Sequence, residues 1–155
     1  MHDGRRVWQS ELSLIDTTLL LAGMLTASVY FNRDTPDEKE IRGLADALYR
    51  RVDWRWAQGD QATVRQGWKP GSGFLHYGWD GYNEATLLYV LGLASPTHPL
   101  PENSFAAWTL TYQWENIYDH ELLYAGPLFI HQFSHAWLDL QGIREIGRAS
   151  CRERV

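Results

Sequence analysis

Two acidic side chains stand near the starts of apolar segments that are predicted to be helices. Asp16 lies in the apolar segment 14–31, three residues after Ser13, and Glu84 lies in the apolar segment 82–94. Hydrolysis of a glycosidic bond needs two carboxyl groups, one to protonate the leaving oxygen and one to activate water or attack carbon. Capping and the helix dipole also favour acids at helix starts. Spacing alone favours that structural role for Asp16. Glu84 fits either role, because a core helix does not need the polar and aromatic run around it.

A pair of histidines one helical turn apart is the next candidate. His131 and His135 are four residues apart and Asp139 follows at the same spacing, on one face of a helix predicted over 126–140. Such a histidine pair can bind zinc, but Gln132 stands where the zincin motif has its glutamate. We therefore predict no metal and no other cofactor. The alternatives are a hydrogen-bonded polar stripe and, preferably, contacts to sugar hydroxyls, because imidazole both donates and accepts.

Aromatic residues make up 14% of the chain and include eight tryptophans. A flat indole face can cover the apolar face of a sugar ring, so this composition fits a sugar-binding cleft as well as a large aromatic core. Four aromatic residues in predicted loops or at helix starts are candidate stacking platforms: Trp68, Trp79, Tyr82 and Tyr124. Three that lie inside predicted helices are expected in the core: Trp108, Trp114 and Trp137.

The elements that would position these residues are predicted to be helices. Besides the segments named above, Thr35 and Pro36 open an amphipathic helix as N-cap and first residue, and a further helix is predicted from about 103 to 114. Residues 57–80 are rich in glycine and aromatic residues, with a turn at 67–71, and no strand alternation persists. We therefore expect an all-α fold.

Apolar and amphipathic helices alternate along the chain. The simplest arrangement is a ring of helical hairpins with the apolar helices inside. Parallel inner helices would open at one shared mouth, which brings Asp16, Glu84 and Pro127 together. Asp53, after the second helix, is a third acid, for which we predict a salt bridge with Arg50 or Arg51 in preference to a catalytic role.

Charge and composition exclude several classes of protein. The 155 residues carry a net charge of −5 and no basic stripe, so we expect no nucleic-acid partner and no direct membrane contact. No apolar run is long enough to span a bilayer, and no targeting signal can be read from the residues after Met1. Residues 145–155 resemble a translated sequencing adapter, so we expect one natural domain over 1–144, an internal fragment, followed by a non-native tail. The single cysteine, Cys151, lies in that tail.

Four stretches carry a resemblance to known proteins. They are residues 15–23, with Ile15-Asp16-Thr17; residues 41–46 with 51–54; residues 81–85, with Tyr82-Asn83-Glu84, together with 94–99; and residues 127–135 with Asp139. In this order they resemble the bacterial glucoamylase-like domain family. Its characterised relatives include endo-β-1,2-glucanases and a domain of cyclic β-1,2-glucan synthases. The resemblance covers essentially all of 1–144.

The resemblance implies a fold and an activity. The fold is a partial (α/α)6 barrel, because the family domain is much longer than this chain, and the activity is cleavage of a β-glucan, with a β-1,2 linkage favoured. The partner is then an oligo- or polysaccharide. The alternatives are a transglycosylation module of a cyclic β-1,2-glucan synthase and a non-catalytic glycan-binding barrel. A periplasmic or secreted location is favoured, and a membrane-associated synthase is the alternative. A partial barrel should expose apolar helix faces and be marginally stable.

The resemblance also implies roles for single residues. Glu84 matches the acid proposed for catalysis, and Asp16 matches a second acidic position in the cleft. The other motif positions expected to line the cleft are Trp79, Tyr82, Asn83, His98, His131 and His135.

Overall fold

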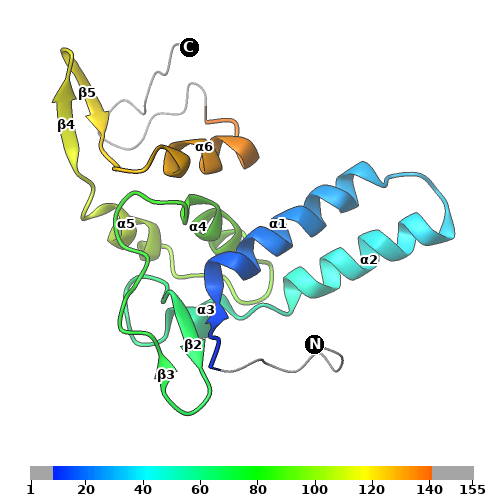
Figure 1. Ribbon diagram of the computed structural model, residues 1–155. Coiled ribbons are helices and arrows are strands. Elements are labelled where there is room, and N and C mark those ends of the chain that lie inside the picture. The colour runs from blue at the N-terminus through cyan, green and yellow to red at the C-terminus, as the bar shows by residue number, and fades with distance from the viewer. Residues whose placement is uncertain (1–8, 141–155) are drawn as a thin grey trace.

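The structure, a computed structural model, describes residues 9–140, so the predicted tail and Cys151 lie outside the described residues. About half of the described chain is helical. Figure 1 shows a long helical hairpin, made of α1 (Leu14–Tyr30) and α2 (Pro36–Arg50), that projects from a group formed by the other helices and two small sheets. Within residues 9–140, no helix has both the length and the apolar character needed to cross a membrane.

The long hairpin begins where its capping residues predict. α1 spans Leu14–Tyr30, and the Ser13 hydroxyl accepts a hydrogen bond from the Asp16 amide at 3.2 Å. α2 spans Pro36–Arg50, with the Thr35 hydroxyl accepting from the Glu38 amide at 3.3 Å. Each cap satisfies an amide that the first helical turn leaves without a partner. α2 packs along α1, so an apolar helix and an amphipathic helix form a pair, as expected.

The expectation of a purely helical fold is wrong, because two small antiparallel sheets are present. The first joins β1 (Leu12–Ser13), β2 (Gly67–Lys69) and β3 (Gly73–Phe74), and the second joins β4 (Trp114–Ile117) and β5 (His120–Leu123). Strands of two to four residues are too short to show the alternation that identifies a strand in a sequence. The turn expected at 67–71 accordingly begins three residues late, after β2.

The second sheet replaces the end of a predicted helix. α5 spans Asn103–Thr109 and stops five residues before Trp114, which lies half-buried in β4. The β4–β5 turn consists of Tyr118 and Asp119, with φ angles of 52° and 61°. A two-residue hairpin loop with a type I′ turn needs a positive φ angle at both central residues.

The remaining helices are shorter than predicted. The short helix α3 (Trp54–Gln58) was not predicted. The Asp53 carboxylate caps it by accepting a hydrogen bond from the Trp56 amide at 2.9 Å. The ion pairs of the described residues do not include the predicted salt bridge of Asp53 with Arg50 or Arg51, and Arg50 pairs with Asp46 at 2.8 Å instead. α4 spans Thr86–Leu93 and α6 spans Leu128–Trp137. α4 packs against both α1 and α6, so the three apolar helices are neighbours.

The core is centred on two stacked rings. Tyr89 of α4 and Trp108 of α5 lie 4.9 Å apart at an interplanar angle of 21°, and both are almost fully buried. Of the three tryptophans expected in the core, only Trp108 is fully buried. Trp137 is 38% exposed, because it ends α6 on an open side.

The Tyr89 hydroxyl connects α4 to the segment before it. It accepts a hydrogen bond from the Val64 amide at 3.1 Å and donates one to the Trp79 carbonyl at 3.0 Å. Burial raises the pKa of this hydroxyl far above its usual range, so it stays protonated and keeps both bonds.

Tyr89→Phe should lower the free energy of unfolding by about 1–3 kcal/mol, because it leaves the Val64 amide and the Trp79 carbonyl buried without their partner. Urea denaturation of the full-length protein measures the change. Tyr124→Phe is the control, because the Tyr124 side chain is 49% exposed. Equal effects of the two substitutions would contradict this role of Tyr89.

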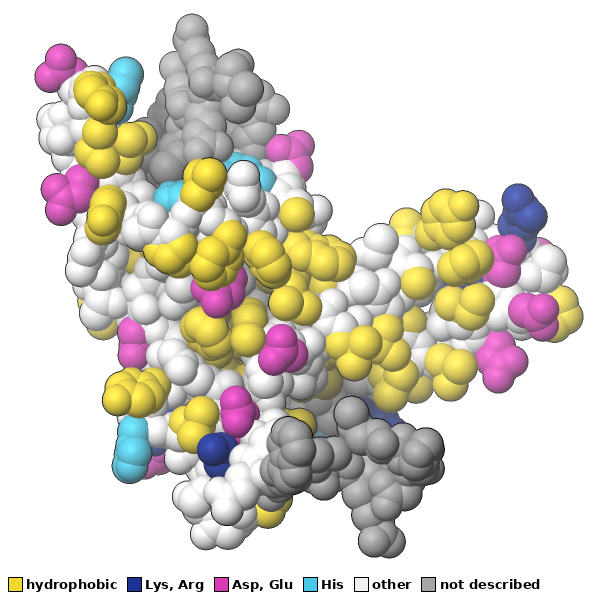
Figure 2. Space-filling model, in the orientation of Figure 1, with side chains coloured by type: hydrophobic (Ala, Val, Ile, Leu, Met, Phe, Trp, Pro, Cys, Tyr) yellow, Lys and Arg dark blue, Asp and Glu magenta, His cyan; other side chains and the backbone are white. Residues whose placement is uncertain are grey.

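The expectation of exposed apolar helix faces is confirmed. Leu20, Val29 and Tyr30 of α1 are each more than 60% exposed, and Leu128 of α6 is 68% exposed. Figure 2 shows hydrophobic side chains along the projecting α1–α2 hairpin.

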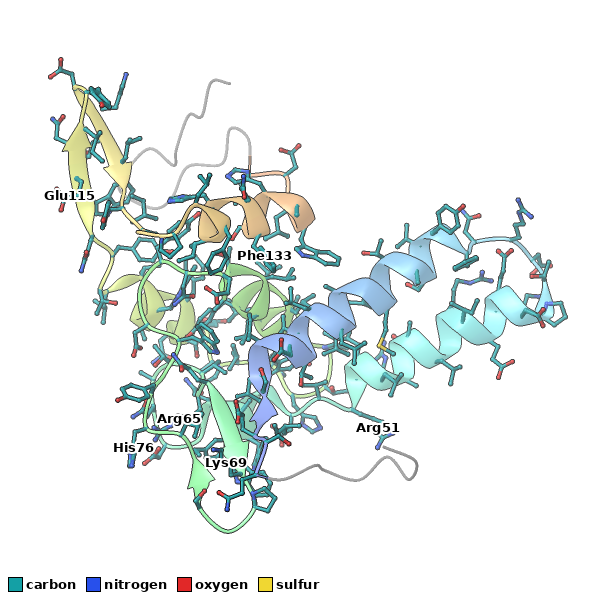
Figure 3. The ribbon with its side chains drawn as sticks, in the orientation of Figure 1. Arg51, Arg65, Lys69, His76, Glu115 and Phe133 are labelled. Atoms are coloured by element: carbon teal, nitrogen blue, oxygen red, sulfur yellow. The ribbon has the colours of Figure 1, made fainter. Side chains whose placement is uncertain are left out.

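The buried side chain of Arg65 holds together the loop that precedes α4. The Arg65 guanidinium donates to the carbonyls of Leu75 and His76 at 3.2 Å and pairs with the Asp60 carboxylate. Figure 3 shows Arg65 and His76 side by side in this loop. The hydrogen bond from Arg65 holds the pKa of the exposed Asp60 carboxyl below its usual 3.8.

This ion pair gives a pH dependence of stability. A depressed carboxyl pKa stabilises the folded state above the unfolded pKa, and that contribution is lost as pH falls through the folded value. We therefore expect stability to drop below about pH 4, and Asp60→Asn to remove part of that drop. Urea midpoints at pH 7 and pH 3 measure it, with Asp34→Asn, an exposed partner of Lys39, as the control. An unchanged pH dependence in Asp60→Asn would refute the assignment.

Candidate active site

A pocket of about 310 Å³ opens between the segment before α4, the base of the β4–β5 hairpin and the start of α6. Its walls combine polar groups with aromatic and apolar surface. The side chains that matter for its chemistry are Asp80, Tyr82, Thr111, Gln113, Tyr124 and Ile130. Such a mixture of flat apolar surface and hydrogen-bonding groups fits a polyhydroxylated ligand.

The segment before α4 is held by the Asn83 side chain. Its carbonyl oxygen accepts from the Ala85 amide at 3.0 Å, and its amide donates to the Asp80 carbonyl at 3.2 Å. Gly81 has a φ of 72° and donates to the Trp108 carbonyl at 3.0 Å. A Cβ at Gly81 would lie 3.0 Å from the Thr111 hydroxyl oxygen, so glycine permits this close approach. These contacts fix the turn against α5.

Glu84 lies half-buried at the end of this turn. α4 begins only at Thr86, so the expectation that Glu84 sits in the first helical turn is wrong by two residues. The Asn83 side chain competes for the local backbone amide and delays the start of the helix. Glu84 is thus presented by a braced turn whose other residues, from Asp80 to Tyr82, line the pocket.

The structure brings three of the predicted site residues together. Tyr82 and Tyr124 both line the pocket. The His131 ring of α6 lies 5.2 Å from the Tyr82 ring, measured between centroids, and Tyr112 lies 5.9 Å from the same ring, edge to face. Ile130, next to His131, closes the wall. The orientation of Tyr82 is therefore set by neighbours from α6 and from the segment after α5.

Other predicted site residues lie elsewhere. Trp68 is in β2, where its ring is 5.8 Å from that of Trp56. Trp79 is half-buried against the hydrophobic core. His98 is exposed in the loop after α4, whereas Glu84 precedes that helix. His135 is exposed one turn after His131.

The histidine stripe is shorter than expected. α6 ends at Trp137, so Asp139 does not share a helical face with His131 and His135. The part of the chain from 9 to 140 contains no group of three or more His, Cys, Asp or Glu side chains arranged to hold a metal ion.

Asp16, like Glu84, is not among the residues that line the pocket. It is exposed in the first turn of α1, directly after β1, and the Leu14 amide of that junction donates to the Gln66 carbonyl at 3.2 Å. The junction is thereby tied to the β1–β2 sheet. The Ser13 cap accounts for the helix start here without any catalytic role for Asp16.

Sequence reasoning missed three polar residues of the pocket. Asp80 precedes Glu84 in the same polar and aromatic run, so the signal that identified Glu84 could also have identified Asp80. Thr111 and Gln113 were overlooked because we predicted a helix through their segment, whereas the chain there leads from α5 into β4.

A family model supports the resemblance found in the sequence. Residues 76–150, which contain Glu84 and the pocket-lining residues, match the family described as "Putative glucoamylase". The resemblance to the glucoamylase-like family is confirmed. The match includes the pocket of this chain but not α1 and α2.

Relatives of the chain point in the same direction. Over 109 residues, 68% of the chain, it is 29% identical to an exo-β-1,2-glucooligosaccharide sophorohydrolase (non-reducing end) of Parabacteroides distasonis. The chain spans only 15% of that protein.

Solved structures share the fold. An endo-β-1,2-glucanase of Chitinophaga pinensis, in complex with sophorotriose and glucose, superposes with a TM-score of 0.71 at 27% identity, over 84% of this chain and 34% of that one. A protein of Bacteroides uniformis, described in the same words as the family, gives a TM-score of 0.78 at 28% identity and the same coverage. The chain therefore spans about a third of those solved relatives.

Proposed function

We propose that the protein containing this chain is a glycoside hydrolase that cleaves a β-1,2-linked glucan, with Glu84 as the proton donor. The observation that carries the proposal is the placement of Glu84, half-buried at the end of the Asn83-braced turn whose Asp80 and Tyr82 line an aromatic pocket. The names of the relatives from Parabacteroides distasonis and Chitinophaga pinensis support the substrate class.

The aromatic and the polar residues of the pocket would make different kinds of contact with a sugar. Tyr82 and Tyr124 offer ring faces to the apolar side of a sugar, and His131 holds the Tyr82 ring from α6. Asp80 accepts hydrogen bonds from hydroxyl groups, while Thr111 and Gln113 can both donate and accept. Glu84 then gives its proton to the glycosidic oxygen of the bound chain.

The fold proposal is a partial (α/α)6 barrel within domain 1–144. α1, α4 and α6 would be inner helices, and α2 an outer one. The neighbouring packing of α1, α4 and α6 and the exposed apolar faces of α1 and α6 support this arrangement.

Product analysis tests the function. The full-length protein is incubated with linear β-1,2-glucan, and with linear β-1,3-glucan as a control for linkage. A hydrolase releases new reducing ends from the first polymer. Redistribution of chain length without new reducing ends would instead identify a transglycosylase, and binding without either change would identify a glycan-binding barrel. The last two outcomes contradict the proposal.

We retain Asp16 as the proposed second acid, and Asp16→Asn tests it. As a catalytic partner of Glu84, Asp16 should be required for turnover, with a loss of kcat of about 100-fold or more. If it only favours the helix start, kcat stays unchanged and stability falls by about 0.3–1 kcal/mol. Steady-state kinetics and urea denaturation of the same variant separate the two roles.

A further inference from the structure

The β4–β5 hairpin projects away from the helices, as Figure 1 shows. The residues that flank its strands, Gln113 and Tyr124, both line the pocket. The Tyr124 amide donates to the Gln113 carbonyl at 2.7 Å, which extends the ladder by one pair beyond Trp114 and Leu123. The pocket wall and the hairpin are therefore one continuous ribbon.

The register assigns each hairpin residue to one of two faces. Side chains alternate along a strand, and cross-strand partners share a face. The face of Gln113 and Tyr124, which we call the pocket-side face, also carries the pairs Glu115 with Leu122 and Ile117 with His120. The opposite face carries Trp114 with Leu123 and Asn116 with Glu121. Leu123 is buried, so the opposite face packs inward at its base.

The pocket-side face has the chemistry of a sugar-binding surface. Ile117 and Leu122 provide apolar area, while Glu115 and His120 are exposed and can hydrogen-bond to hydroxyl groups. From Gln113 to Ile117 the strand rises by about 14 Å, which is longer than one sugar ring. A glucan chain that leaves the pocket along the ribbon would meet these residues in turn.

The tip of the hairpin carries an unusual residue. Tyr118 is 92% exposed and has a φ of 52°. Turns of this type favour asparagine and glycine, because a bulky side chain is strained at positive φ. An exposed aromatic ring kept in a strained position suggests a functional use of that ring.

We propose that the pocket-side face of the β4–β5 hairpin binds further sugar units of the glucan chain outside the pocket, with Tyr118 as a stacking platform at its end. The identity of the ligand rests on the proposed function. The consequence is a preference for long chains over short ones, because only a long chain reaches from the pocket to Tyr118.

Chain-length dependence tests the inference in the full-length protein. The variants are Glu115→Gln and Tyr118→Ala, and the control is Glu121→Gln, the same change on the opposite face. For linear β-1,2-glucan we expect each of the two variants to raise KM about fivefold, the size of one weak contact, and the control to leave it unchanged. For sophorotriose, Tyr118→Ala and the control should match the unchanged protein, because three sugar units do not reach from the pocket to the tip of the hairpin. Equal effects on polymer and trisaccharide, or no effect on the polymer, would overturn the proposal.

Direct binding separates this inference from the proposed function. The Kd values of the polymer and of sophorotriose are measured by calorimetry in a Glu84→Gln background. If the wild-type protein cleaves neither ligand but Tyr118→Ala still weakens polymer binding selectively, the proposed function fails and the hairpin inference stands. If the polymer binds no more tightly than the trisaccharide, or neither binds, the hairpin inference fails.

Discussion

Glu84→Gln in the full-length protein should lower kcat on β-1,2-glucan by about 100-fold or more, with little change in KM. Glutamine keeps the size and hydrogen-bonding ability of the side chain, so the substrate still binds. It has no acidic proton to give to the leaving oxygen, so the transition state loses its stabilisation while the ground state does not.

Two comparisons make this test specific. Glu102→Gln changes an exposed glutamate ahead of α5 and should leave kcat unchanged. A dinitrophenyl glycoside, whose leaving group departs without protonation, should be cleaved by Glu84→Gln at close to the wild-type rate. If both substrates lose activity equally, Glu84 acts on the structure of the site and not as the acid. An unchanged kcat on glucan would refute any role in turnover.

Trp108→Ala should lower the free energy of unfolding by about 3–5 kcal/mol. The ring is 1% exposed, stacks on Tyr89 at 4.9 Å, and meets Phe105 and Tyr112 edge to face at 5.3 Å. Its removal leaves a cavity among three other rings, which cannot collapse to fill it.

Urea denaturation with detection by circular dichroism measures this loss. Trp108→Phe keeps part of the packing and should cost less, which keeps the prediction measurable if the alanine variant does not fold. Trp137→Ala, at the partly exposed end of α6, should cost about 1 kcal/mol or less. Equal costs at the two tryptophans would contradict the placement of the core at Trp108.

The sequence predicted best where local chemistry decides the structure. Ser13 and Thr35 mark the starts of α1 and α2 because each supplies a hydroxyl to an amide three residues later, and nothing distant is needed. Position inside a helix predicted the burial of Trp108 but not the exposure of Trp137, which depends on what packs against the end of α6. Tyr82, Tyr124 and His131 were each identified from the sequence, and the structure brings them together around one pocket.

The failures have a common cause, which is dependence on contacts far along the chain. β1 exists only because Leu12 pairs with Trp68, and two residues carry no alternation of their own. The late start of α4 is an exception, because it depends on a local contact of the Asn83 side chain with the Ala85 amide. Asp80, Thr111 and Gln113 belong to the pocket only because the turn before α4 docks against the end of α5.

The pairing of Leu12 with Trp68 also bears on the order in which the chain folds. α1 and α2 are joined by a short turn, so their contacts can form within microseconds once both segments exist. The β1–β2 pairing closes a loop of more than fifty residues that contains this entire hairpin. Closing a long loop costs entropy before any contact offsets it, so such pairings form slowly. The α1–α2 hairpin should therefore be complete before its own N-terminal end is fastened, and the apolar side of α1 is exposed to other chains during that interval.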